Sequence, residues 1–361
     1  MITFAITTFV LLAPPTLTFA SPAPEWTAKF AGTSGWIGGD AVYSVRVNEK
    51  RVLWFFGDTF IGTVKDGKRS GAAMVNNTVG VMEGATIHFH QGQKRDGKPA
   101  AIFIPKDGKG YYWPLGGEMS REMSAARSGA KLVLVLVRVE STKAGGAFGF
   151  RQIGQELAVI ENPTDEPAKW AVNYSPLPFA QFEPKHERLW GGAVRTVGDT
   201  TYIYGSEDRE KKLGSRRLLT AKVETSKLAD PSAWRFRTAD GWSEKLEDAI
   251  GTVRGLATEF SVGPAPTGGY VLTYTENGIG DRIVGRFAAE PDGPWSEPVL
   301  LYSCPEKANK KVFCYAAKAH HFHESNELLV GYCVNGWNFS TSIDDQSVYR
   351  PQFIRVKLSA K

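Results

Sequence analysis

Cysteine is scarce in this chain of 361 residues, which contains only three. An odd number excludes a framework in which every cysteine is paired within the chain. Cys304 and Cys314 flank one loop and could form a disulfide in an oxidising compartment, which would leave Cys333 alone in an apolar strand. The cysteine spacings match no zinc-ligand pattern, so we predict no metal site at them.

A strong charge of one sign is also missing, since 43 Lys and Arg stand against 38 Asp and Glu. The densest basic stretch, REKKLGSRR at residues 209–217, fits a solvated loop with no basic face beside it. We therefore predict no nucleic-acid partner.

Long apolar segments are confined to the start of the chain. Residues 1–20 are apolar and uncharged, contain two consecutive prolines and end in the small-residue sequence TFA, although the usual Lys or Arg is missing. This pattern predicts a signal peptide over residues 1–20, a mature domain over residues 21–361 and a secreted or periplasmic location. No later segment is long and apolar enough to span a bilayer, so we expect no membrane partner after cleavage.

Helical periodicity is almost absent, whereas β-branched and aromatic runs recur between Gly, Pro, Asn and Asp. Aromatic residues make up 12% of the chain and there are 38 Gly, a mixture that favours short strands and tight turns. Some runs, such as KLVLVLVRVE at residues 131–140, are apolar at both odd and even positions, which predicts strands buried on both faces.

The strand-like runs fall into five groups with a common plan. A strand opens each group, a more apolar strand follows, and a polar or Trp-bearing edge closes it; the groups span about residues 26–90, 101–163, 174–242, 259–305 and 315–358. Aromatic and Gly marks repeated once per group, at about 68 residues each, are typical of propeller blades. We predict an all-β chain folded as a five-bladed β-propeller in a single domain. Six blades and a pair of β-sandwiches are the alternatives.

Two aspartates lie at the open end of a predicted hairpin. Its strands are DAVYSVRV (residues 40–47) and RVLWFFGDT (residues 51–59). If the turn is the three residues Asn48 to Lys50, Asp40 lies directly opposite Asp58. A two-residue turn would make them diagonal neighbours on opposite faces, and the sequence does not decide the register. In both registers the two carboxylates reach the same end of the hairpin.

Such a pair is costly, because like charges directly opposite each other destabilise a sheet. Each Asp alone could simply bind backbone N–H groups in a Gly-rich turn. As a pair, however, neighbouring carboxylates push their pKa values apart, so that one stays ionised while the other keeps its proton longer. This arrangement suits general acid–base chemistry on a glycosidic bond.

A third carboxylate, Glu259, stands at the start of the strand in GLATEFSVGP. A Glu in this position would point into the central funnel of a propeller and join the two aspartates. Alternatively, Glu259 could form an ion pair with Arg254 or Arg282.

Other polar and aromatic residues are candidates for sugar binding. His320, His321 and His323 lie close together, but this spacing places them on both faces of a strand, which disfavours a metal site. We predict that His320 lines a sugar site instead. Tryptophan can stack on a sugar ring, although most tryptophans of a propeller are structural. The candidate platforms are Trp36, Trp190 and Trp337.

The segment GWIGGDAVYSVRVNEKRVLWFFGDTFIG at residues 35–62 resembles the opening of a family of secreted bacterial five-bladed β-propellers, formerly of unknown function, that includes endo-D-arabinanase-type glycoside hydrolases. Later segments also match, among them MVNNTVGVM, TEFSV, YAAKAHHFH and LLVGYCVN. The resemblance implies that the Asp40 and Asp58 carboxylates are catalytic and that the anomeric carbon is inverted. We assign Asn77, in MVNNTVGVM, to substrate binding. The chain has KAHH where the family usually has KAHP, which leaves the substrate open.

These observations predict a secreted, inverting glycoside hydrolase that acts on a pentofuranose-type, arabinan-like or related polysaccharide or oligosaccharide. We rank Asp40 first as the general base; Glu259 could be the general acid, with Asp58 tuning its pKa. No cofactor is expected, although a structural Ca²⁺ in the central channel is an option. The alternatives are a carbohydrate-binding propeller without catalysis and an interaction protein of the cell envelope.

Overall fold

The computed structural model of the chain describes residues 13–120, 129–143, 148–322 and 325–360. Within these ranges the chain is mostly β-strand, which confirms the prediction of a β protein. The α-helices are short: α1 (Pro24–Thr27) and α2 (Phe339–Asp344). The 3₁₀ turns are η1 (Ala28–Phe30), η2 (Pro167–Lys169), η3 (Thr225–Lys227), η4 (Pro231–Ala233), η5 (Leu246–Asp248) and η6 (Pro305–Ala308). No helix in the described ranges has the length and hydropathy needed to cross a membrane.

Five antiparallel sheets, named sheets I to V, follow one another along the chain. Sheet I contains β3 (Tyr43–Arg46), β4 (Arg51–Phe56), β7 (Thr78–Glu83) and β8 (Thr86–His90). Sheet II contains β11 (Tyr111–Met119), β12 (Leu132–Ser141), β13 (Phe150–Ile160) and β14 (Val172–Pro176). Sheet III contains β15 (Gln181–Glu183), β16 (His186–Val197), β17 (Thr200–Asp208), β18 (Arg217–Glu224), β19 (Arg235–Arg237) and β20 (Trp242–Ser243). Sheet IV contains β21 (Phe260–Pro264), β22 (Tyr270–Thr275), β23 (Arg282–Ala288) and β24 (Val299–Ser303). Sheet V contains β25 (Val312–Ala319), β26 (Glu327–Gly336), β27 (Pro351–Ser359) and β1 (Thr16–Pro22).

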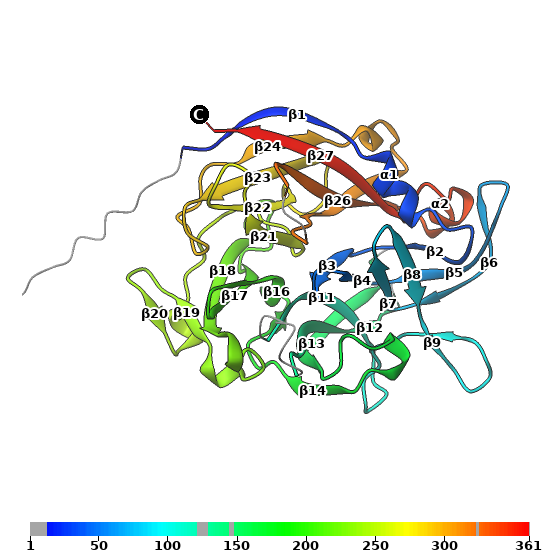
Figure 1. The fold of residues 1–361 in the computed structure, drawn as a ribbon, viewed down its shortest axis with the longest axis horizontal. Helices are drawn as coiled ribbons and strands as arrows, with labels where there is room; N and C mark the ends of the chain where they lie inside the picture. Colours follow the sequence, from blue (N-terminus) through cyan, green and yellow to red (C-terminus); the bar gives the residue numbers. More distant parts are fainter. Residues whose placement is uncertain (1–12, 121–128, 144–147, 323–324, 361) are drawn as a thin grey trace, which may run out of the picture.

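The long inner strands of successive sheets lie near the middle of the molecule. Figure 1 shows β3, β11, β16 and β21 there, with later strands of each sheet further out. Strand β11 packs against β3 and β16, and β21 packs against β16 and β25. The sheets come in the same order as the five groups predicted from the sequence. The number of blades, and closure into a propeller, stay predictions.

Two smaller sheets are inserted between the larger ones. One contains β2 (Ser34–Gly39), β5 (Thr59–Lys65) and β6 (Lys68–Val75), and the other pairs β9 (Gly92–Gln93) with β10 (Pro99–Ala100). The predicted second strand of the Asp40–Asp58 hairpin is therefore divided, because its first part belongs to sheet I as β4 and its continuation joins β2 as β5. The two aspartates lie at the junction between these sheets.

One boundary between the predicted groups is wrong. Tyr174 was expected to open the third group, but it lies in β14 and pairs with Ala158 of β13 in sheet II. The Pro- and Asn-bearing segment at residues 162–167 is a loop within the sheet, after which the chain returns to pair with β13. Turn-forming residues mark both kinds of connection, so the sequence alone does not separate them.

The prediction that some strands are buried on both faces is confirmed. Every residue of β4 is buried, and in β12 the residues from Leu132 to Val137 are all buried. The β12 side chains, with Leu53 and Phe55 of β4, belong to a core that joins sheets I, II and III, whereas the other face of β4 packs in a second core with residues of sheet V. Apolar residues on both faces are stable only where neighbouring layers cover both sides, which fixes the position of the hairpin that carries Asp40 and Asp58.

The first described strand lies across the predicted signal-peptide boundary. Strand β1 pairs with β27 from Thr16 opposite Ser359 to Pro22 opposite Ile354, and Leu17 and Ala20 pack on the core of sheet V (Figure 1). Cleavage after Ala20 would leave only the last two residues of this strand. Residues 1–12 of the predicted signal peptide lie outside the described part of the chain.

We expect β1 to stabilise sheet V. A chain that starts at Ala23 should unfold with a free energy lower by about 2 kcal/mol than one that starts at Ala13, because β27 loses backbone hydrogen bonds and an apolar cover. Denaturant unfolding of the two chains measures the difference. Equal stabilities would contradict a structural role for β1, and N-terminal sequencing of the protein isolated from its native cells would show which form exists.

Candidate active site

The hairpin adopts the register in which Asp40 and Asp58 oppose each other. Tyr43 pairs with Phe55 in β3 and β4, and Gly39 pairs with Thr59 in β2 and β5, which is the same register on both sides of the aspartates. The backbone N–H of Asp40 donates to the carbonyl of Asp58 at 3.3 Å. The turn is therefore the three-residue turn, and the other register is excluded.

The ladder between the two sheets is interrupted at the aspartates. Ala41 and Val42 have φ angles of 67° and 54°, in the left-handed region. This region is unfavourable for residues other than Gly, most of all for a β-branched side chain, at about 1–3 kcal/mol each. Strand β3 therefore begins at Tyr43 rather than at Asp40. Because of this break, the Asp40 and Asp58 side chains need not follow the alternating directions of side chains in a regular strand.

Both carboxylates line one cavity of about 520 Å³, and Glu259 lines the same cavity. They come from three segments: the residue before the Ala41–Val42 break, the link between β4 and β5, and the residue before β21. Much of the remaining wall is aromatic. It includes Tyr111, Trp113, Phe148, Phe150, Phe313 and Tyr315. Carboxylates converging in an aromatic cavity match the composition of sugar-binding clefts.

Asp40 is half-buried and held by two phenol groups. Tyr315 and Tyr349 each donate a hydroxyl hydrogen bond to its Oδ2, at 2.7 and 3.2 Å. Burial, followed by the charge of Asp58, raises the pKa of Asp40 to about 8, against the lowering effect of the Tyr315 hydrogen bond. Asp40 therefore keeps its proton at neutral pH.

Asp58 is held by a different pair of donors. Trp113 Nε1 and Asn76 Nδ2 both donate to its Oδ1, at 2.8 and 3.1 Å. Burial raises the pKa of Asp58 to about 6, and the two hydrogen bonds oppose this rise. Asp58 is therefore mostly ionised at neutral pH. The two aspartates differ in protonation, as expected for a close carboxylate pair.

Glu259 is paired with a lysine rather than with an arginine. Lys318 Nζ donates to Glu259 Oε1 at 3.2 Å, and the same ammonium lies 4.3 Å from the centre of the Tyr43 ring. The predicted alternatives are wrong, because Arg254 pairs with Glu210 and Arg282 pairs with Glu276. Glu259 is therefore ion-paired with Lys318, whose side chain is buried behind the cavity wall and does not line the cavity.

Arg69 fixes the segment that carries Tyr349. Its guanidinium is buried and lies over the Phe60 ring, and it donates only to main-chain carbonyls. The acceptors are Ile37, Ser342, Asp345, Gln346, Val348 and Tyr349. These hydrogen bonds join β6 and β2 to the chain just before β27, and so position the Tyr349 phenol that binds Asp40.

Three of the predicted substrate-binding residues belong to the interior instead. Trp36 is buried, stacks on Phe89 and donates to Thr78, so it cannot present a face to a sugar. Trp190 is fully buried in the core. The Asn77 side chain bonds to the backbone of Phe103 and Tyr112 beneath the sheet. These three predictions are wrong, because strand alternation and packing turn the side chains away from the cavity.

His320 and Trp337 also lie apart from the carboxylates, but in different ways. His320 lines a second, smaller cavity of about 90 Å³, where its Nδ1 hydrogen-bonds to Ser44 Oγ at 2.9 Å. Trp337 is 47% exposed and its ring lies 4.5 Å from that of Phe313, which lines the main cavity. Trp337 therefore lies at the rim, where a longer ligand could reach it. His323, the third histidine of the cluster, is outside the described residues.

The sequence reasoning missed the four side chains that hold the aspartates. They are Asn76, Trp113, Tyr315 and Tyr349. Asn76 was within reach, since it stands next to Asn77 in the same NN pair, in the link between β6 and β7, and only the neighbouring residue was chosen. Within the described residues, three possible metal ligands converge only at Cys304, Glu306 and Cys314, away from this cavity.

We expect the half-buried carboxyl of Asp40 to make stability depend on pH. Its pKa is raised from an ordinary 3.8 to about 8, so the stability it contributes is complete below 3.8 and is lost as the pH rises through 8. Relative to Asp40→Asn, the wild type should lose a few kcal/mol of unfolding free energy between about pH 5 and pH 9. Denaturant unfolding at several pH values measures this. Parallel curves for the two proteins would contradict the raised pKa.

Gly57 leaves room for the Asp40 carboxylate. A Cβ at this position would lie 2.6 Å from Asp40 Oδ1, so Gly57→Ala should displace the carboxylate and destabilise the protein by about 1–3 kcal/mol. Gly154→Ala is the matched control, since a Cβ there meets nothing within 4 Å. The control should be neutral or stabilising by a few tenths of a kcal/mol. Equal effects of the two substitutions in thermal unfolding would argue against the close approach at Gly57.

Comparisons with known proteins show which structures resemble this chain and which family it belongs to. No curated protein matches the chain. A provisionally assigned hydrolase from Bacteroides ovatus ATCC 8483 has a similar structure, with a TM-score of 0.68, 18% identity and coverage of 94% of this chain and 90% of that one. An α-L-arabinofuranosidase from Lactobacillus brevis is more distant, with a TM-score of 0.49, 12% identity and coverage of 89% and 90%. The model of the family described as Domain of unknown function (DUF5005) matches residues 24–358, and the chain belongs to this family.

Proposed function

We propose that the protein is an inverting glycoside hydrolase built on a five-bladed β-propeller. Five sheets follow in chain order, with β3, β11, β16 and β21 around the middle of the molecule, and β1 adds a fourth strand to sheet V, which supports the propeller (Figure 1). Sheets V and I also meet through side chains, because Tyr315 and Ser44 reach across to Asp40 and His320. Substrate would enter the cavity at one mouth of the central funnel.

The observation that carries the proposal is the convergence of Asp40, Asp58 and Glu259 on one aromatic-walled cavity. Two of these carboxylates, Asp40 and Asp58, are half-buried and form no ion pair with a described residue, and their pKa values are raised to about 8 and about 6. Burial of this kind costs stability and is typical of acid–base groups at active sites. A purely structural role would not offset that cost.

The two aspartates suit complementary roles at neutral pH. Asp40, which keeps its proton, would donate it to the leaving oxygen as the glycosidic C–O bond breaks. Asp58, which is ionised, would take a proton from the water whose oxygen attacks the anomeric carbon from the opposite side. This assignment reverses the ranking made from the sequence, in which Asp40 was the first choice as base.

Inversion requires space for a water molecule, with about 6.5–9.5 Å between the two carboxyl groups. The donors favour such a separation. Tyr315 and Tyr349 hold Asp40 from sheet V and the segment before β27, whereas Trp113 holds Asp58 from sheet II. The backbones are adjacent, but the side chains are drawn toward different walls of the cavity.

The remaining polar groups suit substrate recognition. Glu259 adds an acceptor to the cavity wall that would bind a sugar hydroxyl, and the buried Lys318 holds this carboxylate in place through their ion pair. Trp113 offers an aromatic ring next to Asp58. The resemblance to arabinanase-type propellers points to a pentofuranose polymer, and the apolar residues 1–20 support export to the periplasm or the medium.

Activity should depend on both aspartates. Asp40→Asn and Asp58→Asn should each lower kcat/KM by about 10³-fold, because each removes one proton transfer. The wild-type profile of kcat/KM should be bell-shaped, rising as Asp58 ionises near pH 6 and falling as Asp40 loses its proton near pH 8. Release of reducing ends from a panel of polysaccharides, with pentofuranose polymers included, measures these changes.

The control for these variants is Asp66→Asn, which removes an exposed carboxylate from a turn and should leave activity unchanged. Circular dichroism establishes that each variant is folded. Full activity in either active-site variant would sink the mechanism. Binding of a polysaccharide without product release by the wild type would favour a non-catalytic carbohydrate-binding protein instead.

A further inference from the structure

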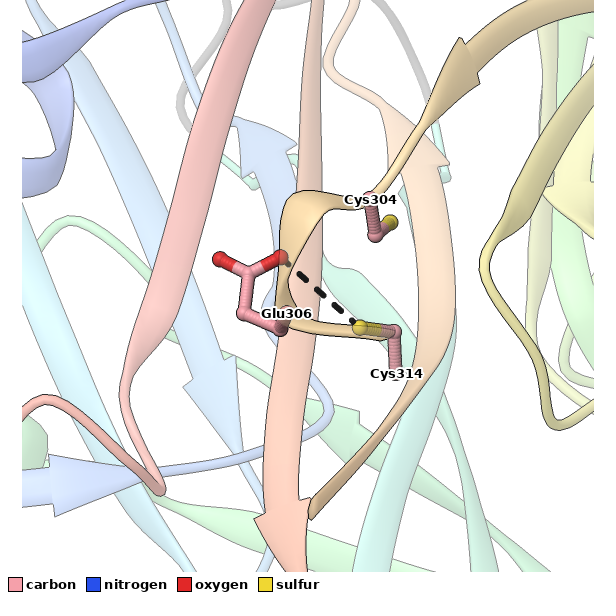
Figure 2. A group of neighbouring side chains, drawn as sticks. All are labelled: Cys304, Glu306 and Cys314. Carbon is pink, nitrogen blue, oxygen red and sulfur yellow. Dashed lines mark hydrogen bonds between the residues drawn. The ribbon is translucent and has the colours of Figure 1, made fainter. Parts of the chain in front are cut away.

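Three potential metal ligands meet outside the main cavity. The sulfur atoms of Cys304 and Cys314 and a carboxylate oxygen of Glu306 all lie within 4.8 Å of one another. Cys304 directly precedes η6, Glu306 lies within it, and Cys314 belongs to β25. Figure 2 shows the Glu306 carboxylate and the Cys314 sulfur facing each other, with Cys304 on the adjoining turn.

The cluster is enclosed and its carboxylate is oriented. Cys304 is 0% exposed and Cys314 is 3% exposed. The Cys314 thiol donates to Glu306 Oε2 at 3.9 Å, and the Tyr332 hydroxyl lies 3.1 and 3.2 Å from the two carboxylate oxygens. A hydrogen bond from a neighbouring group to a ligating carboxylate is the usual support around a bound metal.

The cluster gathers acidic groups without a cation to balance them. Lys307, the nearest lysine in sequence, pairs with Asp281 at 2.9 Å, and no ion pair of Glu306 occurs among the described residues. The neighbouring Cys314 thiol, burial and the Glu306 charge raise the pKa of the Cys304 thiol. A bound divalent cation would instead favour the ionised forms, because its charge stabilises thiolates and carboxylate together.

We propose that Cys304, Cys314 and Glu306 bind one Zn²⁺ ion. Zinc accepts cysteine thiolates at about 2.3 Å and carboxylate oxygens at about 2.0–2.2 Å, so tetrahedral ligands lie roughly 3.5–3.8 Å apart. The Cys314–Glu306 distance of 3.9 Å is already close to this value, and the other ligands need only small side-chain movements. Water or the Tyr332 hydroxyl would supply the fourth ligand.

A disulfide between the two cysteines is the competing state. It would satisfy both sulfurs, but it gives no role to the Glu306 carboxylate, which Tyr332 orients beside them. A metal site uses all three groups. The absence of a zinc pattern in the sequence has a simple reason, because the third ligand is a glutamate between the cysteines rather than a Cys or His.

The ion would fasten the start of β25 to η6. Cys314 is followed by Tyr315, whose hydroxyl holds Asp40, and the Cys314 carbonyl accepts from the Gly280 N–H at 3.0 Å. Zinc would therefore support the strand that carries one of the two phenols, without itself touching the cavity. The site is independent of the proposed hydrolysis, and its test does not use activity.

Metal content of the full chain tests the site. Protein purified without chelator and dialysed against Zn²⁺ should hold about one zinc per chain by mass spectrometry of the metal. Cys304→Ser and Cys314→Ser should each lose most of it. Cys333→Ser is the matched control, since Cys333 is equally buried but lies in β26 outside the cluster, and it should keep the metal.

A second measurement needs no variant, in case a serine variant does not fold. Wild-type chain loaded with Co²⁺ should show the near-ultraviolet absorption of a thiolate–cobalt bond, and the metal should protect Cys304 and Cys314, but not Cys333, from alkylation after mild unfolding. Absence of the cobalt band, equal metal in Cys304→Ser and wild type, or a native Cys304–Cys314 disulfide in peptide mapping would each overturn the proposal.

Discussion

The structure depends on holding two half-buried carboxylates next to each other, with no ion pair to either among the described residues. Asp40 and Asp58 share a backbone hydrogen bond, and neither is fully exposed to solvent. Four neutral donors compensate them: Tyr315 and Tyr349 for Asp40, and Trp113 and Asn76 for Asp58. Neutral donors fix the side chains while leaving both pKa values raised, whereas an arginine in their place would lower them. The choice of donor thus keeps the pair in the pH range where proton transfer is useful.

The donors are held by a second layer of contacts. Arg69 donates hydrogen bonds to the carbonyls of the segment before β27 and so positions the Tyr349 hydroxyl next to Asp40. Only arginine has enough planar donors for this set of carbonyls, because lysine offers a single ammonium. Gly38 is part of the same fit, since a Cβ there would lie 2.5 Å from the guanidinium and 2.4 Å from the Tyr349 carbonyl. Elements far apart in the chain therefore act on a single carboxylate.

The sequence was sufficient for features that depend on local patterns. Alternation and turn residues predict the strands, the order of the sheets and the placement of both aspartates at one end of a hairpin, and one of the two registers proposed is the one observed. The sequence was insufficient for features that depend on which face of an element packs against which distant segment of the chain. Trp36 and Asn77 were assigned to the cavity, yet Trp36 stacks on Phe89, and Asn77 hydrogen-bonds to the backbone near β11 from the link between β6 and β7. Likewise, Tyr349 reaches Asp40 from 309 residues away, and no local pattern reveals such a contact.

The strain at Ala41 and Val42 connects these observations. An unbroken hairpin would place the Asp40 and Asp58 side chains about 4.5–5.5 Å apart on one face, too close for a water molecule between them. The left-handed turn costs a few kcal/mol, but it lets Asp40 bind Tyr315 of sheet V and Tyr349 before β27 while Asp58 binds Trp113. The doubly buried strands β4 and β12 stabilise the fold enough to tolerate both the strain and the half-buried charge. The structure therefore combines a well-packed core with a strained site that carries two carboxylates, as expected if the proposed proton transfers take place there.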